Sequence, residues 1–167
     1  LAHRELSHGV TLTAVQTTKF KTSLIGITFL EKLSGETAAH NAILPALLRR
    51  GTKHHPDMVS MSAALDDLYG GAIDPMVRKK GETQCIGFVG SFLDDAYVPE
   101  ESSILEAASR LMAEILLEPA GPGGRFLEEY LESEKWNLRN RIRARINDKQ
   151  QYAQCRLVSQ MCSGEGY

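Results

Sequence analysis

The stretch that decides the fold is AIDPMVRKKGETQCIGFVGSF, residues 72–92. It divides into two strand-like segments, AIDPMVRKKG (72–81) and ETQCIGFVGSF (82–92), with a turn expected at Lys80-Gly81. Strands joined by so short a turn pair with each other in antiparallel fashion. The stretch therefore predicts a β-hairpin and, with it, an antiparallel sheet.

Upstream, two more strands are expected at GVTLTAVQT (9–17), where apolar residues alternate with threonines, and at TSLIGITFLEKL (22–33). Helices are expected at AAHNAILPALLRRG (38–51), HPDMVSMSAALDDLYGG (55–71), PEESSILEAASRLMAEILLEP (99–119), and from near Phe126 to about Met161. The order ββααββαα predicts an α+β fold with an antiparallel-rich sheet and helices packed on one face. Residues 1–167 are interpreted as one domain.

The composition narrows the class of protein. A chain of 167 residues is long enough for one domain with a hydrophobic core. Its net charge of -2 is too small to steer a polyanion or a membrane surface toward it. No apolar run approaches the ~18–20 residues of a membrane span, and the first residues, LAHRELSHGV, have no signal-peptide pattern. We therefore expect a cytoplasmic protein that binds no membrane.

The first expected helix belongs to the stretch HNAILPALLRRGTKHHP, residues 40–56, which raises the question of a metal site. An inverted zincin carries H-x-x-E-H on a helix, so that two histidines on one face bind zinc and the glutamate polarises water. Just before RRGT, the corresponding register is AILPA, with Ala42 and Ala46 in the histidine positions and Pro45 in the glutamate position. No methyl group binds zinc and proline is no base, so the residues predict no working site in this register.

Three histidines nearby leave a weaker alternative open. His40, His54 and His55 are close in sequence, and an unorthodox metal site would use them as ligands. His54 and His55 are adjacent, so their side chains diverge in any regular structure. Surface histidines in a loop are the commoner outcome. Pro45 also affects the helix itself, which is expected either to begin near this residue or to be kinked there.

The last expected helix has an acidic first half, followed by arginines that alternate along the chain. Its inward stripe is predicted to be Leu127, Leu131, Leu138, Ile142 and Ile146. Arg139 and Arg143 form one stripe and Arg141 and Arg145 another. Arginines in such a run can bind nucleic acid. The small net charge and the lack of interleaved exposed aromatics favour instead a solvated, partner-facing or ion-paired helix face, so nucleic-acid binding is not the preferred interpretation.

Several segments, in order along nearly the whole chain, resemble the N-terminal part of insulinase/pitrilysin-type zinc peptidases, the inverzincin clan. They are KFKTSLIGITF, ILPALLRRGT, LDDLYGGAID, KKGETQCIGF, AEILLEP, FLEEYLESEKWNLRNRI, INDKQQYAQCR and MCSGEGY. The resemblance is greatest to a non-catalytic bacterial subgroup associated with elongation factor P modification. It implies a mitochondrial-processing-peptidase-like metallohydrolase unit, here the N-terminal portion of a longer tandem-domain chain. It also implies a third zinc ligand, a glutamate, near Asn140 and Arg141, where this sequence offers none.

The resemblance further implies a role without catalysis. The chain is expected to be a pseudoenzyme subunit that pairs with a zinc-bearing partner in a heterodimer, or with itself, and holds no cofactor of its own. An extended peptide would add to the edge of the second strand, with Leu24, Gly26, Thr28 and Leu30 as candidate contacts. An active metallopeptidase with unorthodox ligands and an RNA- or ribosome-associated module remain as alternatives.

Overall fold

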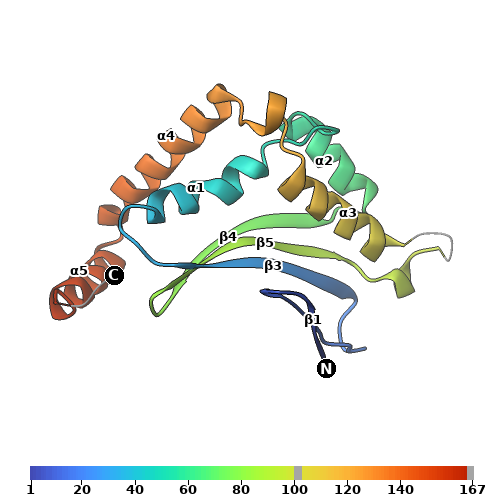
Figure 1. Cartoon of the computed structure of the whole chain (residues 1–167), viewed down its shortest axis with the longest axis horizontal. Coiled ribbons are helices and arrows are strands. Elements are labelled where there is room, and N and C mark those ends of the chain that lie inside the picture. The colour runs from blue at the N-terminus through green and yellow to red at the C-terminus, as the bar shows by residue number, and fades with distance from the viewer. Residues whose placement is uncertain (100–102, 165–167) are drawn as a thin grey trace.

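The computed structural model describes residues 1–99 and 103–164, and it is an α+β fold built on two antiparallel sheets (Figure 1). The main sheet has the strand order β3-β5-β4, and a separate hairpin pairs β1 with β2. The strands are β1 (Ala2–Ser7), β2 (Val10–Ala14), β3 (Thr22–Lys32), β4 (Ala72–Lys80) and β5 (Thr83–Leu93). The α-helices are α1 (Ala38–Leu48), α2 (Met58–Asp67), α3 (Ile104–Leu117), α4 (Glu128–Ala144) and α5 (Lys149–Met161), with 3-10 turns at Asp95–Tyr97, Pro122–Gly124 and Arg145–Asn147.

Strand β5 is the centre of the fold, because it pairs with β3 on one side and β4 on the other. The predicted hairpin of residues 72–92 is confirmed, with Gly81 in a left-handed conformation (φ 58°) in the turn. Alternate residues of β5 point to the core, as a strand with one covered face requires. Phe88 and Phe92 are each only 1% exposed, and Ile86 is buried beside them.

Helices α1 to α4 lie on one side of the main sheet, as the sequence predicts, whereas α5 lies beyond the end of the sheet (Figure 1). Helix α3 contributes most of the helical core, through Ala108, Leu111, Met112 and Ile115. In Figure 1, α1 and α4 lie side by side over the same face, whereas the β1–β2 hairpin lies on the opposite side of β3. None of the described helices combines the length and the apolar character needed to cross a membrane.

The N-terminal part differs from the expected order. Strand β1 was not expected, and residues 9–17 yield only the short β2, so the described chain begins βββαα. The two strands pair in antiparallel register from Ala2 opposite Ala14 to Ser7 opposite Val10. Every residue of this hairpin is exposed. β2 still alternates apolar residues with threonines, whereas the only apolar residues of β1 are Ala2 and Leu6, so its sequence shows no alternation.

The single long helix expected from Phe126 to Met161 is also wrong, because the helix is interrupted after Ala144. Asp148 leaves the helical conformation (ψ 90°), and its carboxylate accepts a hydrogen bond of 3.0 Å from the backbone N–H of Gln151. A capping carboxylate satisfies a backbone donor that a continuous helix would have bonded internally. Ile142 and Ile146 of the expected inward stripe are 54% and 61% exposed.

Helix α1 settles the two alternatives for Pro45. The helix begins at Ala38, well before Pro45, so the alternative that it starts near this proline is wrong. Pro45 lies inside the helix and is fully buried. Its carbonyl still accepts a hydrogen bond of 3.2 Å from the backbone N–H of Arg49. The ring therefore costs the helix one donor while filling space in the core.

Gly87 provides a test of how closely β3 and β5 approach. A methyl group at Gly87 would lie 1.9 Å from the carbonyl oxygen of Ile27, so Gly87→Ala forces β3 away from β5. We expect it to lower the free energy of unfolding by about 1–3 kcal/mol, measured by urea denaturation. Gly26→Ala is the matched control, because no atom lies within 4 Å of the added methyl group. Equal unfolding midpoints for the two variants would contradict this account of the strand contact.

Candidate functional site

The site that the sequence singles out lies on α1. Ala42 and Ala46 are half-buried there, and Pro45 between them is fully buried. The adjacent Asn41 fixes this part of the helix to β5, because its side-chain amide donates to Gln84 Oε1 at 3.1 Å. The buried Gln84 donates in turn to the carbonyl oxygen of Ala38 at 3.0 Å. These hydrogen bonds hold the start of α1 against the sheet, next to the three positions that correspond to H-x-x-E-H, Ala42, Pro45 and Ala46 (below, the degenerate positions).

Ala46 opens on a cavity of about 330 Å³, lined by Ala46, Arg49, Arg50, Met58, Pro75 and Glu134. The polar centre of this cavity is an ion pair between Glu134 on α4 and Arg50, the second residue after the end of α1. Arg50 Nε donates to Glu134 Oε1 at 2.7 Å, and Arg50 Nη2 donates to Ser133 Oγ at 3.0 Å. Glu134 is only 7% exposed, so the guanidinium supplies the partner that a buried carboxylate needs.

The next two residues of the RRGT segment, Gly51 and Thr52, fix the loop that follows α1. Thr52 is completely buried, donates to Glu114 on α3, and accepts a hydrogen bond of 2.9 Å from the backbone N–H of His55. At Gly51 a methyl group would lie 2.5 Å from the carbonyl oxygen of Pro56, so only glycine fits there without displacement. The segment is therefore fixed between α3 and α4 by contacts that involve no metal.

Tyr130 adds a third contact from α4 to this loop. Its hydroxyl donates to the carbonyl oxygen of Pro56 at 3.2 Å. The Arg50 guanidinium lies 5.9 Å from the centre of the Tyr130 ring, within the range of a cation–π interaction. Arg50 is thus held by a carboxylate, a hydroxyl and an aromatic ring, all from α4.

A zinc ion does not fit the degenerate positions. The side chains of Ala42, Pro45 and Ala46 carry no nitrogen, oxygen or sulfur donor, and zinc in proteins is bound by such atoms. On α4, the region that the resemblance assigns to the third ligand has Asn140 and the cation Arg141. A permanent positive charge there opposes the binding of a divalent cation. The donor set therefore disagrees with the metal that the resemblance implies for active relatives.

The structure does not gather the alternative histidines into a ligand set. His40 lies at the start of α1, with Nδ1 3.2 Å from the carbonyl oxygen of Glu36. His54 lies in the loop after α1, with Nε2 3.5 Å from Glu118 Oε2, and His55 follows it. Within residues 1–99 and 103–164, no group of three histidine, cysteine, aspartate or glutamate side chains is placed to hold a metal ion.

The four candidate peptide contacts lie on β3, which is an edge strand of the main sheet. Leu24, Gly26, Thr28 and Leu30 are all exposed, whereas the alternate residues Ile25 and Ile27 pack against the core. Leu24 and Leu30 are 71% and 69% exposed. Among the described strands, β5 alone pairs with β3, so the other edge of β3 offers its backbone groups for pairing.

Asp94 anchors the beginning of this edge strand. Ser23 Oγ donates to Asp94 Oδ2 at 2.7 Å, and the backbone N–H of Ala96 donates to Oδ1 at 3.1 Å. These hydrogen bonds to the charged form hold the pKa of Asp94 below its ordinary value. Because the pKa is lowered by folding, this contribution to stability is present at neutral pH and is lost as the pH falls through the folded pKa.

Sequence reasoning missed the Arg50–Glu134 pair. Glu134 belongs to an acidic run that is typical of a solvated helix start, and nothing in its own neighbourhood distinguishes it from Glu132. The available signal was its position relative to the apolar stripe. Glu134 is three and seven residues after Leu131 and Leu127, so it lies on their side of the helix.

No protein-family model matches the chain. The chain is 35% identical over 159 residues to a Bacillus subtilis (strain 168) protein named "Probable inactive metalloprotease YmfF". This match covers 95% of the present chain and 37% of the relative. A crystal structure of a conserved protein from Enterococcus faecalis V583 matches with a TM-score of 0.87 and 30% identity, again over 95% of this chain and 37% of the other. The chain therefore shares this solved fold and spans little more than a third of the length of either relative.

Removing the cation from the site should leave a buried charge. We expect Arg50→Met to lower the free energy of unfolding by about 1–3 kcal/mol, because Glu134 loses its partner. Adding Glu134→Gln to this variant should recover part of the loss, because the buried group is then uncharged. Urea denaturation of the single and double variants measures this coupling. Glu132→Gln is the control: it breaks an exposed pair with Lys135 and should cost less than about 1 kcal/mol. Additive losses at positions 50 and 134 would contradict the pairing.

Proposed function

We propose that this chain is part of a non-catalytic, peptidase-like subunit of the insulinase/pitrilysin type, whose work is scaffolding and peptide binding. The observation that carries the proposal is the AILPA register on α1, where Ala42, Pro45 and Ala46 replace the zinc-binding and base residues of H-x-x-E-H. The similarity to a protein named "Probable inactive metalloprotease" supports it. Because the chain spans 37% of that relative, the activity of the whole protein is part of the proposal.

The contacts around the degenerate site support a scaffolding role. Arg50, Thr52 and Tyr130 tie the exit of α1 to α3 and α4 through side-chain contacts that need no metal. The helix that carries zinc in active relatives is thus held in place by the protein alone. In this proposal the subunit forms one wall of a peptide chamber, and a zinc-bearing partner supplies the chemistry.

The two edges of the main sheet are not equally suited to accept a peptide strand. β4 carries Pro75, which has no N–H to donate, and the basic run of residues 78–80, and both features discourage strand addition. β3 lacks proline and exposes Leu24 and Leu30 beside its open edge. We therefore assign peptide binding to β3. Backbone hydrogen bonds along this strand would give affinity, and side chains at alternate positions would give selectivity.

Metal analysis and a hydrolysis assay test the non-catalytic proposal together. We expect the purified protein to contain far less than stoichiometric zinc and to leave casein and insulin intact, with or without chelator. The physical reason is that the α1 register supplies no donor atom. Stoichiometric zinc together with chelator-sensitive hydrolysis would favour the alternative of an active metallopeptidase with ligands such as His40, His54 and His55.

Peptide binding at β3 is tested by NMR titration with extended peptides, in the presence and absence of a zinc-bearing relative. We expect the largest shifts in the backbone amides of β3, because strand addition forms new hydrogen bonds along its edge. Thr28→Pro removes an N–H from this strand and should reduce the shifts, whereas Met76→Pro on the opposite edge is the matched control. Unchanged β3 amides at saturating peptide in both conditions would remove this part of the proposal.

A further inference from the structure

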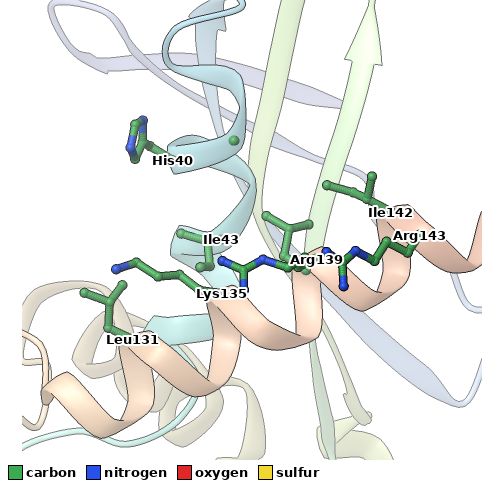
Figure 2. A pocket seen from close by; sticks show the side chains of 9 residues that line it. His40, Ile43, Leu131, Lys135, Arg139, Ile142 and Arg143 are labelled. Carbon is green, nitrogen blue, oxygen red and sulfur yellow. The ribbon is translucent and has the colours of Figure 1, made fainter.

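A groove of about 410 Å³ lies between α1 and α4, away from the cavity beside Ala46 (Figure 2). Apolar side chains line much of it, and a second group of lining side chains is basic. The apolar side chains are Ala39, Ile43, Leu131, Leu138 and Ile142, and the basic ones are Lys135, Arg139 and Arg143, with His40 at the start of α1. Figure 2 shows Ile43 on α1 facing the α4 side chains across this space.

The positive charge beside the groove is largely unbalanced. Among the residues that the structure describes, no carboxylate lines the groove. Within the described part of the chain, Arg139 and Arg143 form no ion pair or hydrogen bond through their side chains, and only Lys135 has an acidic partner, Glu132, at 2.7 Å. An apolar surface beside unpaired cations is complementary to a ligand that combines apolar side chains with carboxylates.

We propose that this groove binds an acidic amphipathic helix of a partner protein. Both walls are helices whose backbone groups are bonded internally, so no strand edge is available and recognition must come from side chains. Ile142 lies eleven residues after Leu131 on α4, which is about 16 Å at the rise of an α-helix. The ligand is therefore a helix of about three turns with apolar residues at i, i+4 and i+7, flanked by aspartate or glutamate.

Nucleic acid fits this surface less well than an acidic helix does. No aromatic side chain of the described residues lines the groove, so these residues offer bases no stacking partner. Trp136 is 62% exposed on the same helix but does not line the groove. The groove also includes no residue of β3, so it is a binding surface separate from the sheet edge. The two sites can be tested independently, and the groove does not depend on peptide addition to β3.

The test uses a fluorescein-labelled helical peptide of about 14 residues, with leucines at i, i+4 and i+7 and glutamates beside them. Fluorescence anisotropy with the unmodified protein should show binding that weakens as salt is added. We expect Arg139→Glu/Arg143→Glu to weaken binding by about tenfold or more, since two attractive rim contacts become repulsive. Ile142→Glu should do the same by placing a charge on the apolar surface. All three positions are exposed, so circular dichroism should show unchanged folding.

Arg141→Glu is the matched control, because Arg141 is an exposed cation of the same helix that does not line the groove. We expect it to change the affinity by less than about twofold. An equal loss for Arg141→Glu would reduce the effect to general charge attraction and overturn the proposal. So would equal binding of a peptide with the same composition in scrambled order, or tighter binding of an RNA oligonucleotide at the same site. Self-association that vanishes in Arg139→Glu/Arg143→Glu would identify a second copy as the occupant and also overturn it.

Discussion

The ion pair between Arg50 and Glu134 is the interaction on which the rest of the site depends. Glu134 is almost fully buried on α4, where an unpaired carboxylate would be costly, and Arg50 is the residue that reaches it from the end of α1. The pair therefore fixes the position of α1 relative to α4. Both the small cavity beside Ala46 and the longer groove are lined by residues of these two helices, which lie side by side in Figure 1.

The loop after α1 holds the helix in place through contacts that need no metal. Gly51 fits closely against Pro56, Thr52 is bonded to α3, and Tyr130 reaches the loop from α4. None of these contacts passes through the positions of a zinc ligand. In residues 1–99 and 103–164, no buried side-chain nitrogen or oxygen lacks a hydrogen-bond partner, so the small residues Ala42 and Ala46 leave no such atom unpaired there. The contacts that fix this segment thus come from residues other than Ala42, Pro45 and Ala46.

The parts of the fold that the sequence predicts are mostly those with a periodic pattern of apolar residues. β5 and the helix around Leu111 bury one face, and β2 keeps its alternation although it is exposed. β1 has too few apolar residues to show a pattern, and the interruption at Asp148 depends on a local cap within an otherwise helical pattern, so apolar spacing reveals neither. In the candidate site, the absence of metal-binding atoms at Ala42, Pro45 and Ala46 can be predicted from the residue types. The Arg50–Glu134 pair cannot be predicted in this way, because its two residues are far apart in sequence.

The apolar stripe of α4 also shows what apolar spacing cannot predict, namely how deeply each residue of the stripe is buried. Its spacing is helical throughout, yet Leu131 and Leu138 are partly covered while Ile142 is 54% exposed and Ile146 is 61% exposed. Periodicity identifies which face of a helix is apolar, but the neighbouring elements decide how far along the helix that face is covered. Where that cover ends, Ile142 remains exposed beside Arg139 and Arg143, which form no ion pair within the described residues. An apolar surface of this kind, with charges of one sign at its border, is typical of a binding site rather than of an unfinished core.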